Sequence, residues 1–111
     1  MNKTENRAVI DRVAEMYERH PYPPVDEDIQ AYASGEAWLL ESPNPNFHLY
    51  WPHDDVTQDL DILIAGCGTQ QAAQIAASMP QARIVGTDIS DNSLAETKRL
   101  SDQIDAQNIT L

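Results

Sequence analysis

Cysteine, basic residues and long apolar runs are all scarce in this 111-residue chain. The single cysteine, Cys67, excludes an internal disulfide, so a disulfide framework of the secreted kind cannot hold the fold. The longest apolar runs, such as Ile62 to Ala65, are far too short to span a bilayer. The sequence also does not open with the charged and apolar regions of a signal peptide. We therefore expect a cytoplasmic protein that does not enter a membrane.

Positive charge is absent from a long stretch of the chain. No Lys or Arg lies between Arg19 and Arg83, and the formal net charge of the whole chain is -11. Nine acidic residues occupy that stretch: Asp26, Glu27, Asp28, Glu36, Glu41, Asp54, Asp55, Asp59 and Asp61. Such a segment repels a phosphate backbone, so we expect no direct nucleic-acid binding. We interpret the acidity as a source of solubility or as adaptation to salt.

Residues 1–58 predict one clear helix and then an irregular segment rich in proline and aromatic residues. From about Thr4 to Arg19, charged residues separate apolar residues at helical spacing, which is typical of an amphipathic helix. The apolar positions are Val9, Ile10, Val13, Met16 and Tyr17. The prolines within His20 to Pro24 end this helix, because proline lacks a backbone N–H. A short helix is expected around Ile29 to Leu40, and the rest is expected to be ordered loop broken by Pro43, Pro45 and Pro52.

Residues 59–111 predict alternating strands and helices. The expected elements are a buried strand at Asp61 to Gly66, an alanine-rich helix at Thr69 to Met79, a strand at Ala82 to Asp88, a helix from the N-cap Ser90 to about Ala106, and the start of a strand at Asn108 to Leu111. This order implies crossover connections and a parallel sheet. We predict an α/β fold, namely the first three strands of a Rossmann-like doubly wound sheet. Residues 1–58 form a lead-in that is a candidate lid or substrate cap.

A glycine loop and an acidic residue carry the chemical signal. In a doubly wound sheet, ligands bind outside the carboxyl ends of the strands. Gly66 and Gly68 follow the first expected strand, and without Cβ atoms they permit a tight turn and let a ligand approach the main chain. Asp88 ends the second strand, where a carboxylate can accept hydrogen bonds from both hydroxyls of a ribose. The pattern predicts a nucleoside-containing ligand; the alternative is a simple turn, with Asp88 capping a helix.

The stretch GCGT at Gly66 to Thr69, followed by Asp88, resembles the class I S-adenosylmethionine-dependent methyltransferases. The resemblance covers roughly Asp59 to Leu111, and YERHPYPP at Tyr17 to Pro24 is similar to the lead-in of some bacterial members. It implies that the cofactor is S-adenosylmethionine and that the substrate is a methyl acceptor, which the sequence does not identify. The cofactor-binding residues that it implies are Gly66, Cys67, Gly68, Thr69 and Asp88.

The chain departs from the family pattern at three points. Ile64 stands where the family often has an acid, and Gln70 stands where it usually has a third glycine. The amide of Gln70 or Gln71 either donates to the carboxylate of the cofactor or faces solvent. The family's domain also continues through further strands beyond Leu111. We therefore expect this chain to be the N-terminal portion of such an enzyme, with little or no methyl transfer by itself.

Two other functions remain open. An NAD(P)-binding oxidoreductase domain would need a glycine at the position of Gln71 to complete the GxGxxG fingerprint. A non-catalytic module for cofactor binding or interaction is the other possibility. The pattern indicates no oligomeric state and no general base.

Other candidate sites are weaker. No metal site is expected, because tight ligand spacing is missing among His48, His53, Asp54 and Asp55. Cys67 is not expected to be a nucleophile, since it has no evident His partner. The aromatic residues of the lead-in are expected to pack a small subdomain against the sheet; they are Tyr22, Trp38, Phe47, Tyr50 and Trp51.

Overall fold

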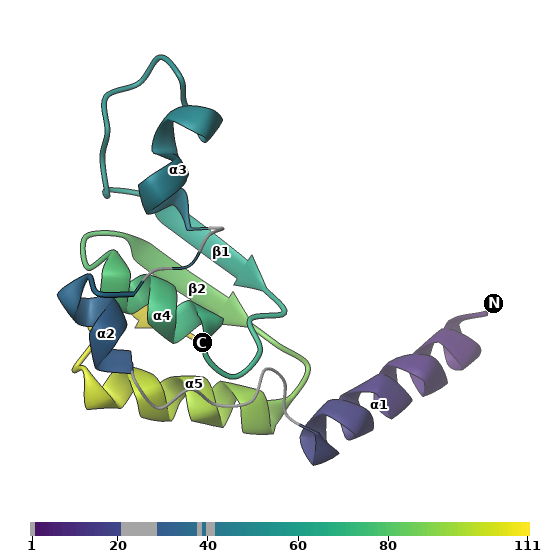
Figure 1. Cartoon of the computed structure of the whole chain (residues 1–111). Coiled ribbons are helices and arrows are strands. Elements are labelled where there is room, and N and C mark those ends of the chain that lie inside the picture. Colours follow the sequence, from purple (N-terminus) through teal and green to yellow (C-terminus); the bar gives the residue numbers. More distant parts are fainter. Residues whose placement is uncertain (1, 21–28, 38, 40–41) are drawn as a thin grey trace.

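The fold is mixed α/β, with a parallel sheet and helices packed on one face of it (Figure 1). The computed structural model describes residues 2–20, 29–37, 39 and 42–111. Within these residues the elements are α1 (Lys3–Arg19), α2 (Ile29–Ser34), α3 (Pro43–Tyr50), β1 (Asp61–Ala65), α4 (Gln71–Ser78), β2 (Arg83–Thr87), α5 (Asp91–Gln103) and β3 (Ile109–Thr110). The expected order of strands and helices after residue 59 is confirmed. The lead-in is only partly as expected.

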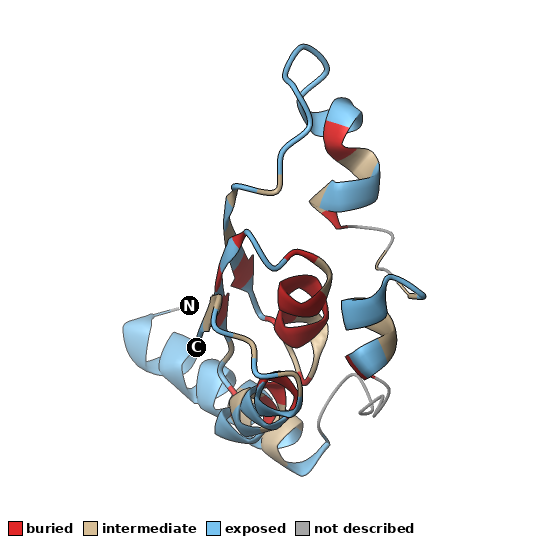
Figure 2. Ribbon diagram, turned by 90° about the vertical axis from the view of Figure 1, so that its left-hand side faces the viewer, coloured by how far each residue is buried: buried red, intermediate tan, exposed pale blue. Residues whose placement is uncertain are grey.

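The three strands lie side by side in the order β1-β2-β3, and both pairs are parallel. Ile64 on β1 pairs with Gly86 on β2, and Ile84 on β2 pairs with Ile109 on β3. Helices α4 and α5 connect the strands and pack together on the same face, with α2 on the outer side of α4 (Figure 2). All strands therefore end at one edge of the sheet, which is where a ligand site is expected.

Small residues on α4 allow this helix to approach the sheet closely. Ala72, Ala76 and the C-cap Met79 are buried against Ile84 in the main hydrophobic core. A Cβ added at Gly86 would lie 3.1 Å from the Cβ of Ala72, so this glycine leaves room for the first turn of the helix. The alanine-rich sequence and the buried glycine thus set the separation between helix and sheet.

The side chain of Asn108 joins the end of α4 to the sheet. Its amide Nδ2 donates to the carbonyl oxygens of Ala76, Met79 and Ala82, at 3.3, 3.0 and 3.0 Å. Two of these carbonyls lie at the end of α4, where no further helical N–H can reach them. Asn108 therefore satisfies backbone acceptors just before the chain enters β3.

The other face of the sheet carries exposed apolar side chains. Leu63 on β1 is 68% exposed, and its partner Val85 on β2 is 43% exposed. The sequence predicted that the first strand is buried on both faces, and this was wrong for the described part of the chain. The run is apolar on both sides, but the described helices cover only the side of Ile62 and Ile64.

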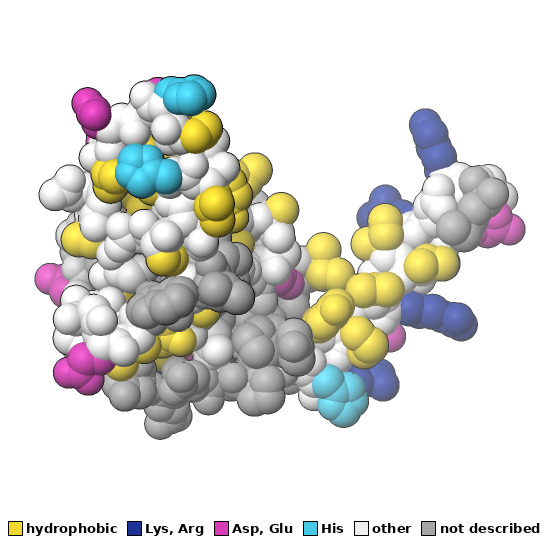
Figure 3. Space-filling model, turned by 45° about the horizontal axis from the view of Figure 1, so that its top comes forward, with side chains coloured by type: hydrophobic (Ala, Val, Ile, Leu, Met, Phe, Trp, Pro, Cys, Tyr) yellow, Lys and Arg dark blue, Asp and Glu magenta, His cyan; other side chains and the backbone are white. Residues whose placement is uncertain are grey.

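The first expected helix is confirmed as α1, which starts one residue earlier than expected. Asn2 and Glu5 form a capping box: the N–H of Glu5 donates to Asn2 Oδ1 at 2.9 Å, and the N–H of Asn2 donates to Glu5 Oε2 at 3.0 Å. The helix has no buried residue and projects from the body (Figure 1). Its apolar side chains are exposed, as Figure 3 shows; among them are Val9, Ile10, Val13 and Met16.

The loop expected after the short second helix is interrupted by α3. Pro43 and Pro45 were expected to break any long element and to leave ordered loop here, but both lie in the first turn of this short helix, where a backbone N–H has no helical partner to lose. The helix is kinked at Asn46, where φ is -113°. The second helix itself is shorter than expected, because Gly35 follows it with a φ of +83°.

The aromatic residues of the lead-in have different surroundings. Phe47 is buried, and its ring centroid lies 5.1 Å from that of Trp51. Tyr50 is exposed. Tyr22 and Trp38 lie outside the described residues. A small aromatic cluster therefore exists on α3, while the packing of the whole set against the sheet stays a prediction.

Candidate functional site

The glycine loop lies at the carboxyl end of β1, between the strand and α4. Gly66 has a φ of +68° and Gly68 a φ of +64°, so both occupy the left-handed region that side chains disfavour. A Cβ added at Gly66 would meet no atom within 4 Å, so the space above this residue is open. The two glycines therefore turn the chain sharply and expose its backbone, as the sequence predicted.

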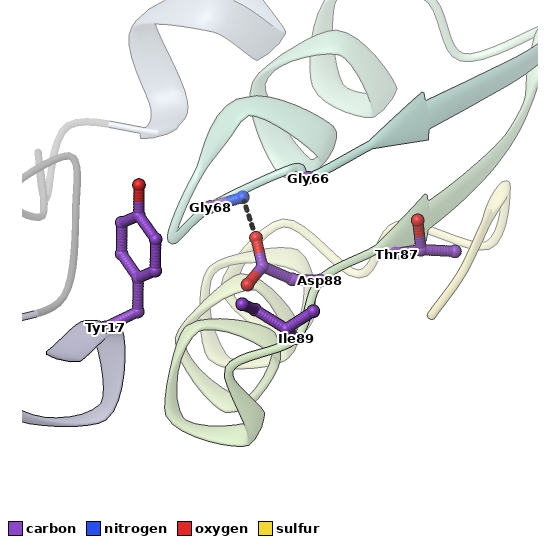
Figure 4. A pocket seen from close by; sticks show the side chains of 6 residues that line it. All are labelled: Tyr17, Gly66, Gly68, Thr87, Asp88 and Ile89. Atoms are coloured by element: carbon purple, nitrogen blue, oxygen red, sulfur yellow. Dashed lines mark hydrogen bonds between the residues drawn. The ribbon is translucent and has the colours of Figure 1, made fainter. Parts of the chain in front are cut away.

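The carboxylate of Asp88 joins this loop to the end of β2. Its Oδ2 accepts a hydrogen bond from the N–H of Gly68 at 2.8 Å (Figure 4). Its Oδ1 accepts one from the N–H of Ser90 at 2.9 Å. A carboxylate offers about four acceptor positions, so these two bonds leave capacity for further donors. Asp88 thus has a structural role of its own, and its predicted role as a ribose acceptor is compatible with it.

The loop is also supported from α5. The hydroxyl of Thr97 lies 3.1 Å from the carbonyl oxygen of Gly68 and 3.1 Å from that of Ser93. Ser90 caps the helix, because its Oγ accepts a hydrogen bond from the N–H of Ser93 at 3.1 Å. The capping role predicted for Ser90 is therefore confirmed. The N–H of Gly68 is held by Asp88, and its carbonyl oxygen shares the single hydroxyl hydrogen of Thr97 with the carbonyl oxygen of Ser93.

A pocket of about 450 Å³ opens between the glycine loop, the end of β2 and α1. Six residues line it: Tyr17, Gly66, Gly68, Thr87, Asp88 and Ile89 (Figure 4). The volume lies in the range of roughly 300–1,000 Å³ that is usual for sites of small molecules. The pocket brings together backbone groups, one carboxylate and apolar side chains, and this combination suits a ligand with hydroxyls and a flat ring.

Two of the predicted cofactor-binding residues have side chains beneath the loop. Cys67 is 1% exposed and Thr69 is 0% exposed, so only Gly66, Gly68 and Asp88 of the predicted set line the pocket. Burial raises the pKa of the Cys67 thiol, and the negative charge of Asp88 adds to this effect. The thiol is therefore held in its neutral form, which makes it a poor nucleophile.

The remaining candidates do not extend the pocket. Gln70 is the N-cap residue of α4 and Gln71 is its first residue, and a bond from either amide to a ligand stays a prediction. Among the described residues, no three His, Cys, Asp or Glu side chains come together where they could hold a metal ion. No helix in the described ranges is both long enough and apolar enough to cross a bilayer.

The chain matches no known protein-family model.

Three residues of the pocket were not predicted from the sequence. Thr87 and Ile89 flank Asp88, so their position at the end of a strand was a usable signal. Tyr17 belongs to a helix far away in the sequence, and it was assigned to an apolar stripe and to a lead-in that is a candidate lid, without a contact of its own. No local pattern indicates that this tyrosine reaches the glycine loop.

Proposed function

We propose that this pocket binds S-adenosylmethionine and its demethylated product, and that the chain is the cofactor-binding portion of a methyltransferase. The observation that carries the proposal is the hydrogen bond of 2.8 Å between Gly68 and Asp88. It unites the glycine loop and the acidic residue, which the sequence places 20 residues apart, on one wall of one pocket.

The residues of the pocket fit the chemistry of such a ligand. The open space above Gly66 admits an atom directly against the main chain. The carboxylate of Asp88 retains acceptor capacity for ribose hydroxyls. Ile89, which is half-exposed beside Asp88, offers apolar surface to a ring. The site therefore suits a nucleoside better than a simple anion, since none of the described residues that line it is Lys or Arg.

The chemistry requires little of the protein beyond binding and orientation. The cofactor supplies a methyl group already activated by a positive sulfur. The residues of this chain would hold the nucleoside in a fixed position and keep water from part of it. Gly66 and Gly68 would do so through the backbone, and Asp88 through its carboxylate. No residue of the pocket is assigned as a general base.

Calorimetric titration tests this proposal. The chain is titrated with S-adenosylmethionine, with its demethylated product S-adenosylhomocysteine, and with NAD. We expect the two S-adenosyl compounds to bind and NAD to bind weakly, because Gln71 stands where a dinucleotide site has its third glycine. Tight NAD binding without binding of the other two would replace the proposal with an oxidoreductase domain. A lack of binding for all three ligands would favour a non-catalytic module.

A further inference from the structure

Helix α1 touches the body of the protein through its last turn. The backbone N–H of Asn92 donates to Glu18 Oε1 at 3.3 Å, and Nδ2 of Asn92 donates to the carbonyl oxygen of Glu18 at 3.2 Å. Asn92 lies in the first turn of α5, so the carboxylate of Glu18 also meets the positive end of that helix. These contacts fix the end of α1 beside the carboxyl edge of the sheet.

The same turn carries Tyr17 into the pocket. Figure 4 shows its ring across the pocket from Gly68 and Asp88, and the side chain is half-buried. Elsewhere along α1 the apolar side chains, including Val13 and Met16, are exposed and do not line this space. Tyr17 is therefore the residue of α1 that lines the pocket opposite the glycine loop.

The placement of Tyr17 is useful because the other described residues that line the pocket supply no aromatic ring. Its other lining residues are two glycines, a threonine, an aspartate and an isoleucine. An aromatic ring supplies a large apolar face with few rotatable bonds, and it attracts both flat rings and positive groups. A ligand that combines a nucleoside with a positive sulfonium would lie between α1 and the glycine loop. There it would contact the face of the Tyr17 ring.

We propose that α1 forms one wall of the ligand site, in which Tyr17 contacts the bound S-adenosyl compound and the Glu18 contacts to Asn92 hold the helix in place. This inference rests on the function proposed above and adds a residue to it. It assigns the lead-in a part in cofactor binding, where the sequence predicted only a lid or a substrate cap.

Titration of Tyr17 variants tests the proposal. Calorimetry with S-adenosylhomocysteine and S-adenosylmethionine is run on the unaltered chain, on Tyr17→Ala and on Tyr17→Phe. We expect Tyr17→Ala to raise Kd about tenfold, which corresponds to the loss of one aromatic contact. Tyr17→Phe should stay within about twofold, because it keeps the ring. An equal loss in both variants would also support contact with the ligand, made through the hydroxyl.

Met16→Ala is the matched control, because this neighbour on α1 is exposed and outside the pocket. It should leave Kd unchanged. Since α1 has no buried residue, all three variants should fold. Equal Kd values for Tyr17→Ala and the unaltered chain would overturn the role of α1 while leaving the proposed function intact. Failure of the unaltered chain to bind either compound would overturn the proposed function, and this inference with it.

Limited trypsin digestion gives a second readout. Four of the seven basic residues of the chain lie on α1, among them Arg12 and Arg19. We expect S-adenosylhomocysteine to slow cleavage after Arg19 in the unaltered chain. In Tyr17→Ala at saturating ligand, cleavage after Arg99 on α5 should still be slowed, but cleavage after Arg19 should not. Equal protection of Arg19 in both proteins would contradict the proposal.

Discussion

Replacing Asp88 by alanine tests how much of the site depends on one carboxylate. The variant loses two hydrogen bonds to backbone N–H groups, those of Gly68 at 2.8 Å and Ser90 at 2.9 Å. Removing a hydrogen bond to a charged group lowers the free energy of unfolding by about 1.5–3 kcal/mol. Asp88 is only half-buried, so water can replace part of each bond. We therefore expect the free energy of unfolding to fall by about 2–3 kcal/mol in total.

Asp91→Ala is the control for Asp88→Ala. Asp91 is exposed in the first turn of α5, where its charge interacts with the helix dipole, so its loss should cost about 0.3–1 kcal/mol. The loss of stability in Asp88→Asn should lie between those of Asp88→Ala and Asp91→Ala, because asparagine keeps one acceptor oxygen but places an amide donor against a backbone N–H. Urea unfolding followed by circular dichroism measures all three variants.

Two results would refute this reasoning about Asp88. Equal losses of stability in Asp88→Ala and Asp91→Ala would show that the bonds to Gly68 and Ser90 contribute nothing. The second result comes from the ligand titration, which is run at a temperature at which Asp88→Ala is still folded. If this variant is folded and binds S-adenosylhomocysteine as tightly as Asp91→Ala does, the carboxylate has a structural role alone.

Two further predictions concern the buried Cys67 and the partly buried Asn108, both away from the pocket surface. Because its side chain is buried, Cys67 should not react with iodoacetamide until the protein unfolds. Burial also raises the pKa of its thiol above the ordinary 9.0. The thiol therefore contributes fully to the free energy of unfolding below pH 9, and this contribution is lost as the pH rises further. Urea unfolding between pH 8 and pH 10 should show a smaller loss for Cys67→Ala than for the unaltered chain, and parallel curves would contradict this account. Asn108→Ala should lower the free energy of unfolding by about 1–3 kcal/mol, because the carbonyl oxygens of Ala76 and Ala82 lose the Asn108 donor, while that of Met79 keeps the N–H of Ala82. Asn108→Asp should lower the free energy of unfolding further, since its carboxylate faces the same carbonyl oxygens. Unchanged thermal unfolding in both variants would show that water replaces the amide.

The elements after residue 59 could be predicted because each carries a local signal. The apolar run ending in Gly66 and the cap at Ser90 depend on neighbouring residues alone, and both appear where expected. The proximity of the glycines to Asp88 could then be predicted, since parallel strands bring their carboxyl ends to one edge of the sheet. For this half of the chain, sequence pattern and topology were sufficient to predict the order of the elements, but not the exposure of Leu63 on β1.

What could not be predicted depends on contacts between distant segments. Tyr17 reaches the pocket through the bonds between Glu18 and Asn92, which lie 74 residues apart. Thr97 supports Gly68 from a helix whose sequence shows only a polar residue at that point. The missed helix α3 has a different cause: Pro43 was weighed as a helix breaker without regard to its position in the first turn.

The support of Gly68 has a consequence for the rates of binding. Since Asp88 holds its N–H and the Thr97 hydroxyl lies against its carbonyl oxygen, we expect the floor of the pocket to keep its shape when a ligand binds. The opposite wall is attached by two long hydrogen bonds between Glu18 and Asn92, which break more readily. Ligand entry and exit should therefore follow the opening of α1, and association should be slower than diffusion allows. Strengthening the attachment of α1 would lengthen the residence time of the ligand more than any change to the floor.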